Sequence, residues 1–288
     1  MRTIDLESLK IFRTVVDEGG VVRAANKLNR VQSNVTKRIR QLEEHLGTRL
    51  FRRDGRSIRL SAEGHNLLTY ADRLLRPADE TVSEMRTGKP KGVFKLGSLE
   101  STAGSRLAPI LSRYHGAYPD VVVELATGTT GALVTRVMNF ELEAAFVSEP
   151  FTAPSLQTRP VFEEQLVLVT SKAIGAVTGP ADLGRSTLIA FPQGCSYRRR
   201  IEEWLGIANM MPERIMEFGS YQAMIACVAA GTGFAVVPKS VLETLRGAKS
   251  VRQHALPKRF SRNRTHIVWH SDPSPSLRGL LSLLAPAG

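Results

Sequence analysis

Four apolar residues between positions 35 and 46 constrain the fold more than any other feature of the chain. They are spaced four, three and four residues apart: Val35, Ile39, Leu42 and Leu46. At about 100° per residue, this spacing predicts a helix with one narrow apolar stripe. Away from the stripe, the N-terminal end of the helix carries amides, hydroxyls and cations, and the anions Glu43 and Glu44 come later. An ordinary solvated helix also carries Lys and Arg, so the flanking sequence decides whether this face meets a partner.

Positive charge is concentrated around this helix. The chain of 288 residues has a formal net charge of +12 and a pI of about 10.1, which favours an acidic partner such as nucleic acid or an anionic membrane surface. Residues 30–59 hold nine cations and three anions, which is half of the total excess in a short part of the chain. Neutralisation of nucleic-acid phosphates requires a local excess of this kind.

The elements on either side predict a winged helix-turn-helix over residues 1–60. Apolar residues at helical spacing predict a first helix, and Ala24–Ala25 predict a short second helix that a neighbour can approach closely. After Gly47, a turn at Asp54–Gly55 between segments of strand character predicts a basic β-wing. Such a domain places the N-terminal residues of its recognition helix at base edges in the major groove. The expected DNA-binding residues are Gln32, Ser33, Asn34, Thr36, Lys37, Arg38, Arg40, Arg52, Arg53 and Arg56.

One long helix is predicted after the wing, over residues 61–90 together with a hinge. Its apolar residues step by three or four, as in a coiled-coil seam. The seam consists of Leu67, Ala71, Leu74, Ala78, Val82 and Met85. Pro77 lies inside this helix and is expected to kink it about one turn earlier. The pattern predicts a linker helix with a coiled-coil seam.

Residues 91–288 alternate between strand and helix patterns. The expected strands include GVFKLGSL, VVVELATG, LEAAFV, EQLVLVT, STLIAF and GFAVVP. Alternation of this kind predicts an α/β domain with parallel sheets. The uncharged run from Phe218 to Pro238 contains Gly231, Gly233 and a terminal proline, so it is interpreted as a buried helix and strand and not as a membrane span.

The first ninety residues resemble the N-terminal domain of the LysR-type transcriptional regulators. The shared pattern is a Leu and a Phe in the first helix, paired alanines in the second, a Gln opening the recognition helix, and then LE, LG, LF.R and a late Gly. In this chain it appears as Leu9, Phe12, Ala24–Ala25, Gln32, Leu42–Glu43, Leu46–Gly47, Leu50–Phe51, Arg53 and Gly64. Gly20, Ser33 and Thr36 stand where the family usually has Ser, Pro and Ser. These departures leave the fold unchanged and bear on the base contacts.

The resemblance implies the organisation of the whole chain. It implies a ligand-responsive regulator that is a dimer through the linker helix, a homotetramer through its effector domains, and binds an interrupted palindrome. Residues 91–288 are then an effector-binding domain of two α/β lobes, like a periplasmic binding protein. We expect lobe one at 91–161 and 268–288, and lobe two at 162–267.

In a two-lobed α/β domain the ligand lies between the lobes, beyond the carboxyl ends of strands and near helix N-termini. The expected effector-binding residues are Glu100, Ser101, Thr102, Thr129, Thr130, Ser148, Ser196, Tyr197 and Tyr221. Each by itself also fits a simple helix-capping role. Helix N-termini with Arg198 nearby favour a ligand carboxylate, whereas Glu100 and Glu149 suit an amine. The expected ligand is therefore an amino acid, a polyamine or a dicarboxylate, and the later segments resemble a glutamate or putrescine-utilisation branch of the family.

The two cysteines raise two other possible functions. Cys195 at a helix N-terminus suggests an enzyme, but the six histidines supply no partner motif, so no catalytic residue is expected. Cys195 and Cys227 suggest a redox-sensing regulator of the same architecture, with two buried thiols as the alternative. The N-terminus has no apolar segment like that of a signal peptide, so we expect a cytoplasmic bacterial protein with no membrane association, no cofactor and no metal. The basic run between Arg246 and Arg264 is interpreted as a solvated face or a subunit contact.

Overall fold

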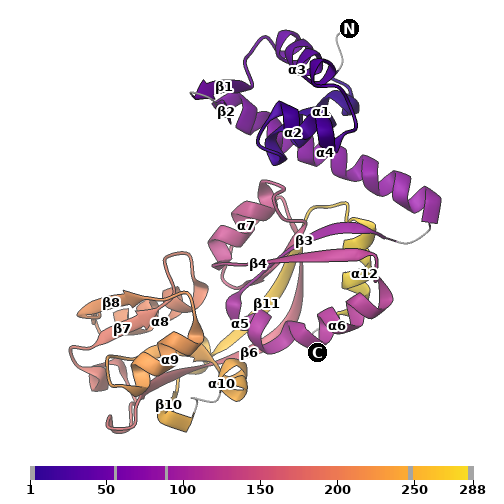
Figure 1. Cartoon of the computed structure of the whole chain (residues 1–288). Helices are drawn as coiled ribbons and strands as arrows, with labels where there is room; N and C mark the ends of the chain where they lie inside the picture. The colour runs from indigo at the N-terminus through magenta and orange to yellow at the C-terminus, as the bar shows by residue number, and fades with distance from the viewer. Residues whose placement is uncertain (1–3, 55–56, 88–89, 246–248, 285–288) are drawn as a thin grey trace. The chain divides into compact units, whose positions relative to one another are not determined.

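The computed structural model describes residues 4–54, 57–87, 90–245 and 249–284. The chain forms two compact units, residues 1–89 and residues 90–288. Figure 1 shows a mostly helical first unit and an α/β second unit. In the described part of the chain, no helix has both the length and the apolar character that crossing a bilayer requires.

The first unit is a winged helix-turn-helix, as the sequence predicts. Its elements are α1 (Leu6–Asp17), α2 (Val21–Lys27), α3 (Gln32–Leu46), β1 (Phe51–Asp54), β2 (Ser57–Leu60) and α4 (Ala62–Thr87). The apolar stripe of α3 packs with Leu9 and Phe12 of α1 and with Ala24 and Ala25 of α2, all of them buried. Strands β1 and β2 pair antiparallel, with Phe51 opposite Leu60. Gly47 ends α3 at a φ of 69°, a backbone conformation that glycine adopts without strain.

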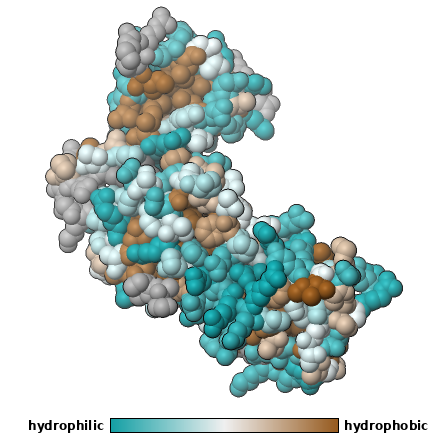
Figure 2. All heavy atoms as spheres, turned by 180° about the vertical axis from the view of Figure 1, so that it is seen from behind, coloured by the Kyte–Doolittle hydropathy of each residue, from teal (hydrophilic) through white to brown (hydrophobic). Residues whose placement is uncertain are grey.

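The apolar residues of the long helix α4 form one buried group and one exposed group. Leu67, Ala71 and Leu75 are buried in the core of the winged unit. Leu74, Val82 and Met85 are exposed, and the helix continues through Pro77. The expected six-residue seam is therefore shortened, because its first two residues pack within their own subunit. Figure 2 shows apolar side chains gathered on one face of the first unit.

The second unit contains a mixed seven-stranded sheet. Parallel strands β3 (Gly92–Ser98), β4 (Val121–Thr127) and β5 (Ala144–Ser148) adjoin β11 (Arg262–Trp269), which is antiparallel to β5 and to β6 (Gln157–Ser171). The expectation of parallel sheets is therefore wrong for β9 (Ala235–Pro238), β10 (Val251–Ala255) and β11: all three run antiparallel to β6, and β11 is also antiparallel to β5. Phe146 faces the core beneath α6 (Ala108–Ala117) and α12 (Pro275–Leu283), while Val147 faces the core beneath α7 (Thr130–Met138). Helices thus cover both faces of the sheet (Figure 1).

Strand β6 connects two lobes. Its residues up to Gln165 pair with β11, and its residues from Leu166 pair with β9 and β10. The far lobe also contains β7 (Thr187–Ala190), β8 (Arg214–Glu217), α8 (Ser196–Gly206), α9 (Tyr221–Ala229), α10 (Lys239–Thr244) and α11 (Lys258–Ser261). The remaining short elements are α5 (Glu100–Thr102), a π-helical turn (Ala103–Leu107) and a 3₁₀ turn (Pro180–Leu183). All eight residues of β11 pair in the near lobe, so we propose lobe crossings at 165–166 and 261–262 in place of 161–162 and 267–268.

Candidate functional sites

The outer face of α3 gathers most of the expected base-reading residues. Gln32, Ser33, Thr36, Lys37 and Arg40 line one shallow depression together with Gln41 and Glu44. The side chains of Gln32, Ser33, Lys37 and Arg40 have no hydrogen bond or ion pair with any other described residue. The Thr36 hydroxyl donates to the Gln32 carbonyl at 3.0 Å, so its hydrogen is used within the helix. Glu44 is one of the anions expected later on this face, and Gln41 is an addition that the same helical spacing could have supplied.

Two of the expected α3 residues lie elsewhere on the helix. Arg38 faces the N-terminus of α1, where its Nη1 lies 3.8 Å from Asp5 Oδ2. Asp5 caps α1 through the Ser8 N–H, and this bond holds the pKa of Asp5 below its ordinary value, with a smaller contribution from Arg38. Asn34 is exposed but does not line the depression. Arg38 is therefore less available to a DNA phosphate than Arg40.

The wing carries one fully described basic side chain among those expected to bind DNA. Arg52 is exposed on β1, opposite Arg59 on β2. The side chain of Arg53 and the whole of Arg56 lie outside the described part of the chain.

Glu43 links the recognition helix to the wing. Its carboxylate is buried and accepts the Leu50 N–H at 2.8 Å, the Phe51 N–H at 3.4 Å and Arg49 Nη1 at 2.9 Å. The sequence pattern marked Glu43 only as an anion and a family residue. Its burial could not be read from helical spacing, because it depends on where the chain runs after Gly47. Glu43 therefore sets the position of β1 relative to α3.

In the second unit, hydroxyls from both lobes meet at a buried point. The Tyr197 hydroxyl of α8 lies beside the hydroxyls of Ser101 and Ser148, and burial raises the pKa of Tyr197 to about 12. Three buried oxygens have no hydrogen-bond partner among the described residues: Ser101 Oγ, Tyr197 Oη and Thr265 Oγ1. Buried hydroxyls are normally hydrogen-bonded. The cluster is thus the part of the cleft best prepared to receive polar atoms of a ligand.

Glu100 and Tyr221 border this cluster. Burial raises the pKa of Glu100, and the Tyr221 N–H at the start of α9 opposes that rise. Burial also raises the pKa of Tyr221 well above its ordinary value. The N-terminus of α9 is therefore already next to a carboxylate of the protein, which leaves less room there for a ligand carboxylate.

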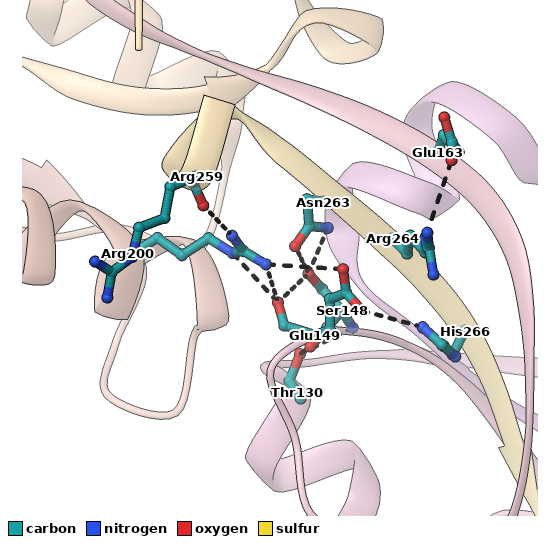
Figure 3. Close-up of polar contacts among 9 residues, drawn as sticks. All are labelled: Thr130, Ser148, Glu149, Glu163, Arg200, Arg259, Asn263, Arg264 and His266. Carbon is teal, nitrogen blue, oxygen red and sulfur yellow. Dashed lines mark hydrogen bonds and ion pairs between the residues drawn. The ribbon is translucent and has the colours of Figure 1, made fainter. Parts of the chain in front are cut away.

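The other expected cleft residues have structural contacts of their own. Thr129 caps α7 by accepting the Ala132 N–H, and the Thr130 hydroxyl bonds the backbone of Ser148. The Ser148 hydroxyl lies 2.7 Å from Asn263 Nδ2, as Figure 3 shows. Thr102 is buried at the end of α5 and Ser196 at the start of α8. Of these residues, Thr129 has the capping role that its sequence context also allows.

Asn263 and Thr265 belong to the cleft but were missed in the sequence. They alternate with Arg262, Arg264 and His266 along β11, so they lie on the inner face while the basic residues lie on the outer one. This period of two was the available signal. The basic run that ends at Arg264 is accordingly a solvated face over most of its described residues, whereas Arg246 lies outside the described ranges.

Contacts between the lobes close the cleft at two places. The Gly131 N–H at α7 donates to the Gly194 carbonyl at 3.2 Å. Buried Glu164 of β6 accepts from Ser240 Oγ at 2.7 Å and from Arg106 Nε at 3.0 Å. Arg106 is therefore engaged by a carboxylate of the protein.

The sequence suggested that Arg198 lies near the ligand, but in the structure its guanidinium does not face the hydroxyl cluster. It is buried, and its guanidinium bonds Glu202 at 2.8 Å and Glu217 at 2.5 Å within lobe two. Glu202 and Glu217 hold the guanidinium away from the cleft. Arg198 does lie near the start of α8, as expected. Glu149 likewise points to the opposite side, toward His266 and Arg200 (Figure 3).

The two cysteines are unpaired and half-buried. Burial raises the pKa of the Cys195 thiol, and the N–H groups of Arg198 and Tyr197 oppose that rise. A raised pKa disfavours the thiolate that redox chemistry requires. Across the described ranges, no group of His, Cys, Asp and Glu side chains has the arrangement of a metal site.

Comparison with known proteins places both units in one family. Residues 6–65 match the model of the bacterial regulatory helix-turn-helix protein, lysR family, and residues 87–287 match the LysR substrate binding domain. The transcriptional regulator GltR of Bacillus subtilis is 34% identical over 282 residues, covering 97% of this chain and 95% of that protein. CzcR of Bacillus anthracis is 36% identical over 284 residues, covering 98% and 97%.

Solved structures agree with this fold. A full-length OxyR variant from Pseudomonas aeruginosa has a TM-score of 0.74 at 20% identity, covering 98% of this chain and 93% of that one. CbnR in complex with its target DNA has a TM-score of 0.68 at 22% identity, covering 98% and 99%. The winged unit, the two-lobed unit and both family matches agree, and the chain belongs to the LysR family of DNA-binding transcriptional regulators.

Proposed function

We infer that this regulator reads DNA through the outer face of α3 and the wing, and that a small metabolite between its lobes shifts that binding. Gln32, Ser33, Lys37 and Arg40 are the observation that supports the DNA contact, because they line one face and make no side-chain bond to any other described residue. Gln32, Ser33, Thr36 and Lys37 face base edges, while Arg40 and Arg52 hold phosphates. Exposed Leu74, Val82 and Met85 of α4 support a dimer that reads an interrupted palindrome. The tetramer expected from the resemblance remains part of this proposal.

Two arginines on the same helix test the DNA face. Arg40→Ala removes an unengaged cation, so the salt dependence of binding should flatten by about one counterion per bound subunit. Arg38→Ala removes a cation that faces Asp5, so its slope should change less. The measurement is fluorescence anisotropy over a salt series, with a duplex carrying the region upstream of the protein's own gene. Equal slopes for the two variants would contradict the assignment of the DNA face.

The unbonded hydroxyls of Ser101, Tyr197 and Thr265 support the ligand site between the lobes. Of the nearby charged groups, Glu164 is paired with Arg106 and Arg198 is engaged within lobe two, which leaves the carboxyl group of Glu100 beside the hydroxyls. A ligand amine therefore suits the cleft better than the second carboxylate of a dicarboxylate ligand does. We accordingly rank an amino acid or a polyamine above a dicarboxylate as the effector.

A thermal-shift screen tests the three ligand classes. A ligand at about one hundred times its Kd adds about 2.7 kcal/mol to stability, which corresponds to about 5–10 °C for a unit of this size. Trp204 and Trp269 both lie in the second unit, so intrinsic fluorescence follows the unit that binds. If no amino acid, polyamine or dicarboxylate raises the transition temperature, the proposed ligand class is wrong. A compound that raises it without changing DNA binding would instead contradict the regulatory role.

A further inference from the structure

A second groove lies where the two lobes meet, and we call it the hinge groove. It is lined by Glu149 and Phe151 after β5, Arg200 of α8, Arg259 and Phe260 of α11, and His266 of β11. His266 pairs with Val147, whereas Thr265 pairs with Ser148. Paired residues on adjacent strands point to the same face, and successive residues point to opposite faces. The hinge groove therefore lies on the other side of the sheet from Ser148 and the hydroxyl cluster.

The size of the groove fits a small molecule. The groove is open to solvent, and the space over it is about 690 Å³, comparable to the ~300–1,000 Å³ of usual ligand sites. Its walls come from both lobes: the loop after β5 belongs to lobe one, and α8 and α11 belong to lobe two. A molecule bound here would touch both lobes at once.

Arg200 is the polar centre of the groove and is loosely bonded. Its side chain is 13% exposed, yet its hydrogen bonds to the carbonyls of Glu149 and Arg259 measure 3.2–3.4 Å. Its Nη2 lies 3.9 Å from Glu149 Oε1, too far for a hydrogen bond (Figure 3). Charged hydrogen bonds are usually about 2.7–2.9 Å long. Arg198, two residues earlier, reaches its carboxylates at 2.8 and 2.5 Å, so the guanidinium of Arg200 is the less satisfied of the two.

The charge of the groove favours an anion. Glu203 at its rim bonds Arg199 at 2.9 Å. Glu149 lies 3.5 Å from His266 Nε2. Arg259 is exposed, with its guanidinium 5.5 Å from the centre of the Phe260 ring. Figure 3 shows the Arg200 guanidinium beside Glu149 and the Arg259 guanidinium turned away from both, so Arg259, an exposed side chain, would have to turn toward the groove to join Arg200 on an anion. A bidentate carboxylate matches the guanidinium geometry.

Apolar surface lies next to these cations. The Phe151 ring packs edge-on against His266, with the ring centres 5.4 Å apart. Pro150 and Pro154 extend the wall beside Phe151. Phe260 also reaches the groove, but its ring is buried in the core of lobe two. A ligand with one acidic group and a hydrocarbon body would match the cationic part of the groove and the apolar part beside it.

We propose that the hinge groove binds a small amphipathic monocarboxylate. Its carboxylate lies on Arg200, with the exposed side chain of Arg259 turned toward it, and its hydrocarbon body lies on Phe151. This site is separate from the proposed effector cleft, and because its walls belong to both lobes, its occupant favours the arrangement in which they meet.

Isothermal titration of the full-length protein with phenylacetate tests the proposal. Two probes of similar shape accompany it: 2-phenylethanol, which is neutral, and phenethylamine, which is cationic. Phenylacetate should bind at least about tenfold more tightly than either probe, since a charged hydrogen bond contributes about 1.5–3 kcal/mol. If phenylacetate does not bind, or the alcohol binds equally well, the carboxylate site is refuted.

Variants locate the binding. Arg259→Gln, in an exposed residue, should weaken phenylacetate binding about tenfold, and Arg200→Gln should weaken it at least as much. Arg214→Gln makes the same change of charge on exposed β8, outside the groove, and should leave the Kd within twofold. Tyr197→Phe in the effector cleft should also leave it unchanged. Loss of binding in Tyr197→Phe with none in Arg259→Gln would place phenylacetate in the cleft and overturn the proposal. If Arg200→Gln fails to fold, Arg259→Gln and the neutral probe still decide.

Discussion

Replacing Tyr197 with Phe removes a buried hydroxyl that has no hydrogen-bond partner in the described part of the chain. An unsatisfied buried polar group costs roughly 1–3 kcal/mol, and the nearby hydroxyls of Ser101 and Ser148 recover part of that cost. We therefore expect Tyr197→Phe to stabilise the second unit by about 1 kcal/mol in the absence of added ligand. For a unit of this size the transition temperature should rise by about 2–4 °C.

Tyr114→Phe is the matched control. Tyr114 is also fully buried, but its hydroxyl donates to the Ser276 carbonyl at 2.9 Å. The same chemical change should destabilise the unit by about 1 kcal/mol, because a hydrogen bond is lost and a buried carbonyl is left without it. The two variants should therefore shift the transition in opposite directions.

The two variants should also differ in effector binding, and here Tyr197→Phe should be the impaired one. Tyr197→Phe removes a group proposed to contact the effector, so the Kd should rise about tenfold for each 1.4 kcal/mol lost. Tyr114→Phe should leave the Kd unchanged, because Tyr114 packs beneath α12 in lobe one. Urea unfolding followed by tryptophan fluorescence, with and without the best compound of the screen, measures both quantities. If Tyr197→Phe destabilises the unit as much as Tyr114→Phe does, the hydroxyl is a structural one and the argument for the cleft fails.

Three further substitutions test the structure of each unit. Glu43→Ala should destabilise the winged unit by about 2–3 kcal/mol, because the buried Leu50 N–H loses its acceptor. The exposed control Glu44→Ala should change stability by less than about 0.5 kcal/mol. The unfolding transition of Glu43→Ala should shift when followed by circular dichroism and stay unchanged when followed by tryptophan fluorescence. Gly64→Ala should destabilise the same unit by about 2 kcal/mol or more, measured by thermal melting, because the added Cβ would lie 2.2 Å from the Leu50 carbonyl oxygen; an unchanged melting temperature would disprove the clash. Burial, and secondarily Arg252, lower the pKa of His254. The contribution of neutral His254 to stability is therefore complete above about pH 6.5 and is lost as pH falls through the lowered pKa. His254→Gln should reduce that pH dependence in urea unfolding, whereas exposed His115→Gln should preserve it.

The fold was predictable where one periodic pattern decided each element. The stripe from Val35 to Leu46 determines which face of α3 is buried, and the burial of Val35, Ile39 and Leu42 confirms it. Strand and helix alternation predicted the α/β unit but not the direction of β11, because local patterns do not encode how a returning strand pairs. Helix α4 shows the same limit, since spacing alone cannot say that Leu67 packs inside its own subunit.

The candidate sites were predictable only as far as they depend on position along an element. Tyr197 and Ser101 follow strands and meet in the cleft, as strand ends in such a fold do. The direction of Arg198 depends on Glu202 and Glu217, and Glu217 is far from it in sequence. The partners of a charged side chain are set by the tertiary fold, so charge alone overestimated what the cleft offers a carboxylate.

The continuity of α4 has a mechanical consequence. Its N-terminal half belongs to the core that supports α3, and its other end carries exposed Val82 and Met85. The helix has 26 residues, which at 1.5 Å per residue makes a rigid lever about 39 Å long. A turn of about 5° at the distal end would move the other end by about 3.4 Å, close to the rise of one base pair. In the proposed dimer, a small change of angle between the two α4 helices would therefore be enough to bring two recognition helices into or out of register with their half-sites.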